Sequence, residues 1–287
     1  MSYSYPTPPA SPSGAGQHFH SDATSKGVWK NDAFNVLDFG ADPTGNTDSH
    51  TAIAAAITAA RNTAQGVGEI YLPGGLYVCG TNLGLSGSGP NSIGIVGDGY
   101  NVSQIYFSGG GGGASMALTQ CHVRDLCIRQ DTNWTGITVL RGTNIENVFF
   151  YGAGGSDNTV ITVTDTGAGP VWITDCTFEN VKLAGGPTGI IQLSGGPTFL
   201  RGLAFHGSTA TGNSTQALIG VDGGVTDFSI TGCMGLSGSS SFKYGTYIAT
   251  GASDRYLVNS NEFSGAATGS VHDGGSGSNK YVANNPL

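Results

Sequence analysis

The sequence predicts an all-β protein, a single right-handed parallel β-helix with an N-terminal capping α-helix. Two observations carry this prediction: a short apolar pattern that recurs every 22 to 33 residues, and 49 glycines among 287 residues. A repeat of about 20 to 50 residues is typical of solenoids, and glycine accepts the backbone conformations of tight corners without steric cost. Charged residues make up only 10% of the chain, against about 25% in ordinary soluble domains, which excludes a typical helix-rich enzyme.

The repeated pattern is apolar-x-x-apolar-x-apolar, and a second family of strands lies between its copies. The copies are Val123–Ile128, Ile145–Phe150, Ile173–Phe178, Leu200–Phe205, Val225–Ile230 and Val258–Phe263, with a partial copy at Val282–Leu287. The second family comprises Gly136–Leu140, Val160–Thr164, Gly189–Leu193, Ala217–Val221 and Gly245–Ala249. Each coil therefore supplies at least two strands that pair with their copies about 4.8 Å away, and the handedness of parallel crossovers predicts the right hand. We expect Phe150, Phe178, Phe205 and Ile230 to stack in one interior column.

The chain divides into three predicted segments. Residues 1–33 are rich in Pro, Ser, Gly and Thr and lack apolar periodicity, so we expect a flexible N-terminal docking arm without regular structure. Residues 34–108 form the opening segment of the β-helix and include a turn over 42–48, followed by a capping helix near 48–62 with one apolar stripe. Residues 109–287 form the remaining coils.

Composition excludes several classes of partner. A formal charge of −8 from 11 basic and 19 acidic residues disfavours nucleic acid, whose phosphates demand clustered Lys and Arg. No apolar run is long enough to span a membrane, and the first residues lack the basic and apolar regions of a Sec-type signal. The five cysteines form no CxxC pair, so we expect small buried hydrophobes rather than disulfides. Phosphate loops and zinc-type spacings are absent from the sequence, so we expect neither a metal nor another cofactor.

The opening segment also carries a resemblance to a known family. The string Asn-Val-Leu-Asp-Phe-Gly-Ala at 35–41 is followed by Gly-Asn-Thr-Asp at 45–48, an Ala/Ile helix, Ile-Tyr-Leu-Pro-Gly-Gly-Leu-Tyr at 70–77 and Ile-Val-Gly-Asp-Gly at 95–99. These strings resemble the N-terminal segment of pectate-lyase-like β-helix proteins, a superfamily similar across phage tailspikes, polygalacturonases and exo-glucanases. The match covers about residues 34 to 108. It is specific for the fold, because the same segment precedes enzymes and non-enzymes.

One outward-facing column combines several polar and aromatic side chains. The seventh position of the pattern reads Arg129, Tyr151, Glu179, His206 and Thr231, and neighbours in this column lie about 5 Å apart. We take Arg129, Tyr151, Glu179 and His206 as candidate substrate-binding residues. Glu179 and His206 are also the candidate catalytic pair, because a carboxylate and an imidazole exchange protons. The alternative interpretation is an ordinary solvated face of a sheet.

The motifs of the family's enzymes are incomplete in this chain. Polygalacturonases resemble one another in a paired Asp-Asp and a Gly-His-Gly, but this sequence has no Asp-Asp pair and Phe205 precedes His206-Gly207. Pectate lyases resemble one another in a Ca²⁺ site of clustered carboxylates, and the chain has only four Glu. Glycosidases need two carboxyl groups within about 9.5 Å, whereas the third position of the pattern sets Asp125, Asp175 and Asp227 two coils apart.

The function favoured by these observations is a virion-associated spike, similar to a tailspike or head spike, that binds host cell-surface polysaccharide without cleaving it. The resemblance implies a homotrimer, attached to other virion proteins through residues 1–33 and located on the virion or outside the cell. One alternative is a polysaccharide-degrading enzyme, either a pectate-lyase-like lyase, a glycoside hydrolase or a capsule depolymerase. A second alternative is a purely structural decoration protein.

Overall fold

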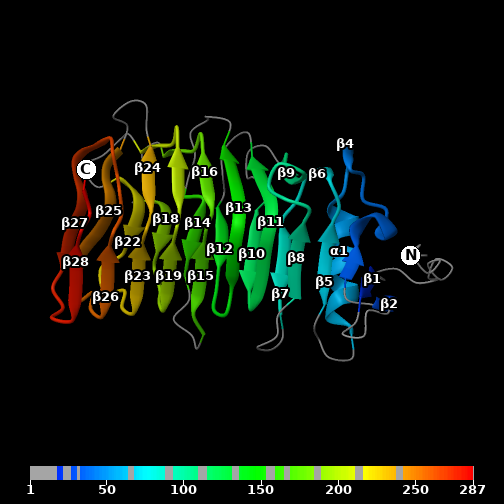
Figure 1. Ribbon diagram of the computed structural model, residues 1–287, viewed down its shortest axis with the longest axis horizontal. Coiled ribbons are helices and arrows are strands. Elements are labelled where there is room, and N and C mark those ends of the chain that lie inside the picture. Colours follow the sequence, from blue (N-terminus) through cyan, green and yellow to red (C-terminus); the bar gives the residue numbers. More distant parts are fainter. Residues whose placement is uncertain are drawn as a thin grey trace, which may run out of the picture.

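The chain winds around one long axis as a parallel β-helix (Figure 1). The computed structural model describes residues 33–63, 68–87, 93–108, 115–130, 136–152, 159–164, 169–183, 189–210, 216–236 and 242–286, together with the backbone of 18–21 and 27–30. Strands of successive coils pair in parallel over residues 33–283 of the described chain. The predicted fold class is therefore confirmed.

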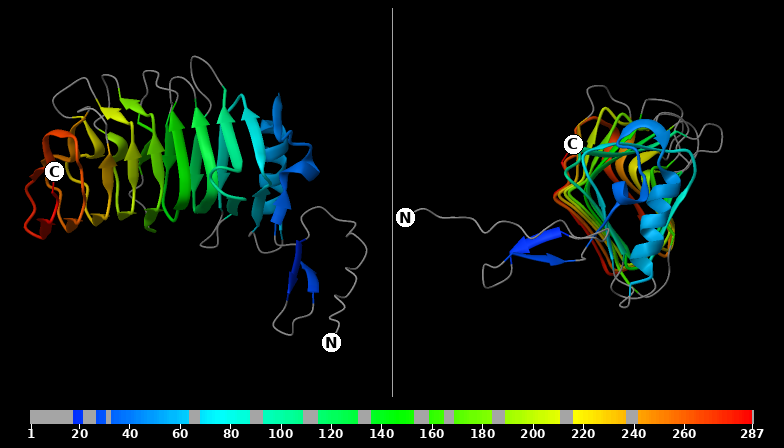
Figure 2. Two further views of the ribbon diagram at one scale, coloured as in Figure 1. Left: turned by 45° about the horizontal axis from the view of Figure 1, so that its top comes forward. Right: turned by 90° about the vertical axis from the view of Figure 1, so that its right-hand side faces the viewer.

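Each coil has three sides, which the view along the axis shows (Figure 2). Face 1 contains β3 (Ala33–Asn35), β5 (Glu69–Leu72), β8 (Ile93–Gly97), the first halves of β11 (Cys121–Gln130) and β13 (Asn144–Gly152), β15 (Val171–Thr174), β19 (Thr198–Arg201), β23 (Phe228–Thr231), β26 (Tyr256–Asn259) and β28 (Lys280–Ala283). Face 2 contains β4 (Thr44–Asp48), β6 (Gly75–Cys79), β9 (Ser103–Phe107), the second halves of β11 and β13, β16 (Thr177–Glu179), β20 (Ala204–His206) and β24 (Met234–Leu236).

Face 3 closes the coil. It contains β7 (Leu83–Ser86), β10 (Met116–Thr119), β12 (Ile137–Val139), β14 (Ile161–Val163), β18 (Gly189–Leu193), β22 (Ala217–Val221), β25 (Phe242–Gly251) and β27 (Ala266–Gly275), with β17 (Lys182–Leu183) and β21 (Thr209–Ala210) joined through β25. The central strands β18 and β22 are buried along their whole length. The sequence of a strand that is buried on both faces is a nearly continuous apolar run, without the apolar–polar alternation of a half-exposed strand.

The N-terminal end of the β-helix is covered by α1 (His50–Arg61) and the 3-10 turn η1 (Val36–Phe39) (Figures 1 and 2). The buried stripe of α1 consists of Ala52, Ile53, Ala56, Ile57 and Ala60. This helix begins two residues later than expected, because Thr44–Asp48 pairs with β6 as a strand instead of forming a turn. The side chain of Asp48 then accepts a hydrogen bond from the backbone N–H of His50 at 2.8 Å. The capping helix is thus confirmed, with a corrected start.

The predicted docking arm falls mostly outside the described residues. Within it, β1 (His18–Ser21) and β2 (Gly27–Lys30) pair antiparallel, with Phe19 opposite Trp29. The expectation of no regular structure is wrong for these eight positions. Their aromatic and β-branched residues favour extended backbone despite the polar composition around them.

A row of residues with positive φ turns the chain out of face 1 toward face 2 in the coils from β11 to β28. Its members are Asp125, Asn147, Asp175, Gly202, Gly232, Ser260 and Asn284, with φ between 52° and 65°. Gly, Asn and Asp tolerate this left-handed conformation best. Asp125 and Asp175 are therefore corner residues, whereas Asp227 belongs to the corner before face 1, where its carboxylate binds Arg255.

The interior column is confirmed for three phenylalanines and wrong for its fourth member. Phe150, Phe178 and Phe205 stack with ring centroids 4.8 and 4.9 Å apart. The next coil contributes Gly235, which pairs with Phe205, while Ile230 pairs with Leu200. Val225–Ile230 matches the apolar pattern by coincidence, because its first residues lie in a Gly-rich corner. The residues that pair with Leu200–Phe205 are five positions further along the chain, at 230–235. The five cysteines are buried and unpaired, as predicted.

Candidate functional site

The predicted column lies in register on the outer side of face 2. Arg129 pairs with Tyr151, Tyr151 with Glu179, and Glu179 with His206. All four residues are half-buried. Thr231, the expected fifth member, instead pairs with Arg201, and Leu236 follows His206. The column is therefore real, with one member corrected by the same five-residue shift.

The column splits into a cation–aromatic half and a hollow half. The guanidinium carbon of Arg129 lies 5.3 Å from the ring centroid of Tyr106 and 5.6 Å from that of Tyr151. Such an arrangement fixes the cation between two ring faces. Beyond Tyr151, a hollow of about 550 Å³ opens, which we call the face-2 hollow; its lining residues are Tyr100, Phe149, Thr177, Glu179, Asn180, His206 and Gly207.

Two aromatic side chains of this hollow were missed from the sequence. The ring of Phe149 stacks on Tyr100 at 5.8 Å and on Tyr151 at 6.4 Å. Phe149 lies two residues before Tyr151 on β13, so it points outward by the same alternation, a signal that was present in the sequence. Tyr100 lies in the turn before β9 and is 43% exposed, and no repeat position predicts it.

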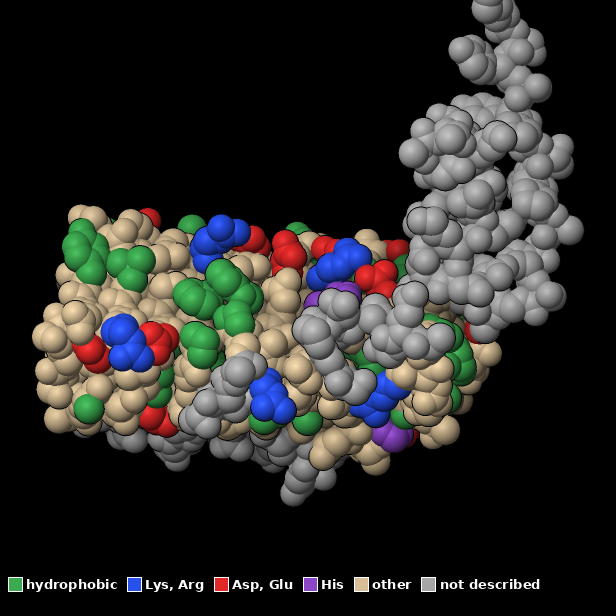
Figure 3. All heavy atoms as spheres, turned by 90° about the horizontal axis from the view of Figure 1, so that it is seen from below, with side chains coloured by type: hydrophobic (Ala, Val, Ile, Leu, Met, Phe, Trp, Pro, Cys, Tyr) green, Lys and Arg blue, Asp and Glu red, His purple; other side chains and the backbone are tan. Residues whose placement is uncertain are grey.

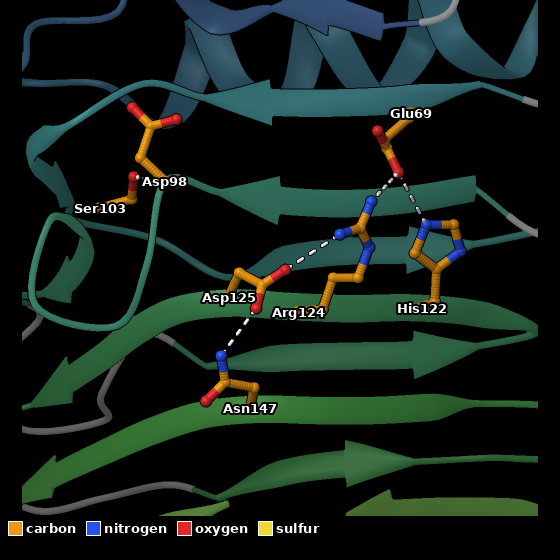
Figure 4. A network of polar contacts seen from close by, with 7 residues as sticks. All are labelled: Glu69, Asp98, Ser103, His122, Arg124, Asp125 and Asn147. Carbon is orange, nitrogen blue, oxygen red and sulfur yellow. Dashed lines mark hydrogen bonds and ion pairs between the residues drawn. The ribbon is translucent and has the colours of Figure 1, made fainter. Parts of the chain in front are cut away.

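A separate polar cluster on face 1 links three coils, those of β5, β11 and β13 (Figure 4). The carboxylate of Glu69 accepts a hydrogen bond from Arg124 at 3.0 Å and contacts Nε2 of His122 at 3.3 Å. Arg124 also donates to Asp125 at 2.9 Å, and Asn147 donates to the other oxygen of Asp125 at 2.7 Å. The hydrogen bond from His122 is the largest influence on the pKa of Glu69 and lowers it; burial opposes this and Arg124 adds to it.

This cluster depends on a glycine in the coil between its two sides. Gly94 lies beside His122 in the register, and Glu69 lies on the other side of Gly94. A β-carbon at position 94 would overlap the imidazole of His122. The bare backbone at Gly94 therefore lets His122 reach across to Glu69. Each ionic group has a partner, so we interpret the cluster as a tie between coils.

Comparisons with known proteins agree with the fold. A family model described as "Rhamnogalacturonase A/epimerase, pectate lyase-like" matches residues 33–281. The chain belongs to this family. The resemblance drawn from residues 34–108 is thereby confirmed and extends over most of the chain. A search of curated proteins found no match.

Solved structures similar to this pectate-lyase-like chain include phage proteins and polysaccharide-active enzymes. The tailspike of E. coli bacteriophage HK620, a mutant in complex with a pentasaccharide, has a TM-score of 0.60 at 15% identity, covering 96% of this chain and 55% of that one. ORF18 of Geobacillus virus E2 has a TM-score of 0.47 at 15% identity, covering 95% and 68%. The Azotobacter vinelandii mannuronan C-5 epimerase AlgE4 A-module has 0.32 at 15% identity, covering 88% and 100%.

The face-2 hollow offers stacking surfaces and hydrogen-bonding groups in one place. Phe149 and Tyr100 supply ring faces, Glu179 supplies an acceptor, and His206 and Asn180 supply donors and acceptors. Among the described residues that line the hollow, Glu179 is the only carboxylate. The described part of the chain contains no group of three or more His, Cys, Asp or Glu placed to hold a metal ion. In that same part, no helix has the length and apolarity needed to cross a membrane.

Proposed function

We propose that this pectate-lyase-like chain is a virion spike protein that binds a host cell-surface polysaccharide in the face-2 hollow and does not cleave it. The observation that carries the proposal is the hollow itself, where Tyr100 and Phe149 stand beside Glu179, His206 and Asn180. A sugar ring has apolar C–H faces and polar hydroxyl edges. Ring faces with convergent hydrogen-bonding groups match both parts.

The chemistry of the lining favours binding over hydrolysis. Glycoside hydrolysis uses two carboxyl groups, about 5 to 9.5 Å apart. Glu179 has Tyr151 and His206 as its neighbours in the register, not a second carboxylate. The tailspike of phage HK620, whose fold is similar, is described in complex with a pentasaccharide, so a β-helix of this kind is able to hold an oligosaccharide on its surface.

A microarray of bacterial O-antigens and capsular polysaccharides tests this function. We expect the wild-type chain to bind at least one glycan, Tyr151→Ala to weaken that binding by removing the ring that supports Phe149, and Phe149→Ala to weaken it further. Thr138→Ala on face 3 is the matched control, because Thr138 is exposed and lies on a different sheet. Wild-type binding in both ring variants would exclude the face-2 hollow as the site.

The second candidate function is a polysaccharide-degrading enzyme. Glu179 and His206 occupy neighbouring coils, which suits a proton-transferring pair. Release of new reducing ends from any glycan that binds would support it, and Glu179→Gln should then abolish release while retaining binding, because the amide keeps the shape but transfers no proton. Release that persists in Glu179→Gln would place the chemistry elsewhere.

Assembly stays a prediction. We expect a homotrimer attached to other virion proteins through residues 1–33, and a chain beginning at Asp32 should fold like the full chain while failing to join the particle. Immuno-electron microscopy of particles tests attachment, and sedimentation velocity tests the trimer. Particle attachment without any glycan binding would favour the purely structural decoration protein.

A further inference from the structure

A second row of apolar side chains runs along the outer side of face 1. One register position reads Trp172, Phe199, Ser229, Leu257 and Tyr281 in successive coils. Trp172 is 45% and Tyr281 53% exposed. Figure 3 shows hydrophobic side chains on this side in two groups, over β15 and β19 and over β26 and β28, with other surface between them. This row lies on a different face from the face-2 hollow.

The row is interrupted at Ser229. The indole of Trp172 stacks on the ring of Phe199 with centroids 4.2 Å apart, but the next coil offers only a hydroxymethyl group. Phe199 and Leu257 are therefore separated by two coil spacings, about 9.6 Å between backbones. The result is a hollow of about 560 Å³, which we call the face-1 slot; its lining residues are Phe199, Asp227, Phe228, Ser229, Arg255, Tyr256, Leu257, Asn279, Lys280 and Tyr281.

The rim of the face-1 slot is polar and its charges are matched. Arg255 donates to both oxygens of Asp227, at 2.7 Å and 2.5 Å. Lys280 pairs with Asp273 at 2.9 Å. The described charged side chains of the slot are therefore all paired, while their polar atoms are still able to form hydrogen bonds. This favours a neutral ligand over an acidic polysaccharide or a phosphate.

Backbone conformation adds an independent observation at the same rim. Asp227 and Arg255 both have positive φ, 61° and 51°; Asp tolerates this conformation, as it does at the corners between faces 1 and 2, whereas the longer Arg side chain is strained in it. The ion pair between them is largely exposed, at 43% and 57%, and exposed pairs stabilise a fold weakly. Strained side chains of this kind gather at functional sites.

We propose that the face-1 slot binds a neutral pyranose unit of a polysaccharide chain, with the sugar ring lying flat against Phe199 and its hydroxyl groups directed to Arg255, Asp227 and Asn279. The ligand class rests on the proposed function, but the residues are separate from the face-2 hollow. The free face of Phe199 supplies the stacking surface, since its other face is covered by Trp172. Leu257 and Tyr281 close the opposite wall.

Trp172 provides a direct readout. The chain has three tryptophans, and a Trp29→Phe/Trp134→Phe variant leaves Trp172 as the single tryptophan, in contact with Phe199 in the wall of the slot. The probes are methyl α-glucopyranoside, methyl α-galactopyranoside and methyl α-mannopyranoside, with glucuronic acid as the acidic comparison. We expect saturable fluorescence changes with at least one neutral pyranoside, and at least tenfold weaker binding of glucuronic acid.

The decisive variant fills the face-1 slot with a larger side chain. Ser229→Phe continues the Trp172–Phe199 stack into the gap and should weaken pyranoside binding at least tenfold, while Thr138→Phe, which introduces the same side chain at an exposed position on face 3, should leave it unchanged. Tyr281→Ala removes the opposite wall without filling the slot and should also weaken binding, so the test survives if Ser229→Phe does not fold. Circular dichroism reports folding in each case.

Three outcomes overturn the proposal: no fluorescence change with any pyranoside, full binding in Ser229→Phe, or loss of the oligomer in Ser229→Phe, which would make the slot a contact with a second copy of the chain. The experiments distinguish failure of the face-1 slot from failure of the face-2 hollow. Pyranoside binding lost in Ser229→Phe but unaffected by Phe149→Ala supports the slot even where the glycan microarray is negative. A microarray signal that needs Phe149, without any pyranoside effect at Trp172, leaves the proposed function standing and excludes the slot.

Discussion

The interior column and the outward column of face 2 come from adjacent residues on the same strands, yet the first repeats one apolar side chain and the second combines several polar and aromatic ones. Inward, Phe150, Phe178 and Phe205 repeat one side chain and stack within 5 Å. Outward, the neighbouring positions hold Tyr151, Glu179 and His206. The coil limits the interior space, so these three successive coils repeat one side chain, whereas the exterior is free to vary. Stability should therefore depend on the first column and binding on the second.

The largest effect is expected inside the column. Phe178 is fully buried between the rings of Phe150 and Phe205, so Phe178→Ala removes two ring contacts and leaves a cavity. We expect a loss of about 3 to 5 kcal/mol in the free energy of unfolding, measured by urea denaturation. An unchanged unfolding midpoint would show that the column does not hold the coils together.

A second, smaller effect is expected where the column is interrupted. At Gly235 the space beside Phe205 is occupied from other directions, since a β-carbon there would lie 2.7 Å from Cδ1 of Leu218 and 3.2 Å from the ring of Phe242. Gly235→Ala should overpack this region and reduce the free energy of unfolding by about 1 to 3 kcal/mol. Gly84→Ala is the control, because a β-carbon there meets nothing within 4 Å. Equal stability of the two variants would contradict the packing assigned to Gly235.

The same coil shows how far the sequence alone reaches. Periodic apolar positions predicted the β-helix, the capping helix and most of the register, because inward side chains must recur at each coil. The pattern failed at Val225–Ile230, where a corner happens to match the strand template, and only the pairing of Ile230 with Leu200 reveals the shift. Pattern matching cannot distinguish such coincidences, since corner length varies from coil to coil.

The candidate site was predicted less completely than the fold. The alternation of β-strands placed Arg129, Tyr151, Glu179 and His206 on one outer column. Tyr100 enters the face-2 hollow from a turn, and turns follow no strand alternation. The contact between Glu69 and His122 joins residues 53 positions apart, and it forms only because Gly94, which lies between them, has no side chain. A pattern of apolar and polar side chains does not show that such a space exists.

That contact allows a smaller, pH-dependent prediction on the exterior. Because the pKa of Glu69 is lowered in the folded state, chiefly by the hydrogen bond from His122, the ionised carboxylate stabilises the fold above its unfolded pKa of about 4.3, and this contribution disappears as pH falls through the folded pKa. Glu69 is 30% exposed, so Glu69→Gln should reduce stability at pH 7 by no more than about 1 kcal/mol. Urea denaturation between pH 7 and pH 3 should show the two proteins converging at the acidic end. A gap that stays constant with pH would exclude the ionised carboxylate as its cause.

The smallest effect on stability is expected in the outward column itself. Tyr151 and His206 are half-buried on the outside of face 2, so truncating either leaves no interior cavity, and surface substitutions of this kind change the free energy of unfolding by about 0.5 kcal/mol or less. Tyr151→Ala and His206→Ala should therefore unfold like the wild type in urea, in contrast to Phe178→Ala on the neighbouring strand. Tyr151→Ala also removes one of the two rings that flank Arg129, but the contact with Tyr106 remains to hold the guanidinium. A loss as large as that of Phe178→Ala would mean that the outward column holds the coils together as the phenylalanines do, and the division between an interior that stabilises and an exterior that binds would not hold for this face.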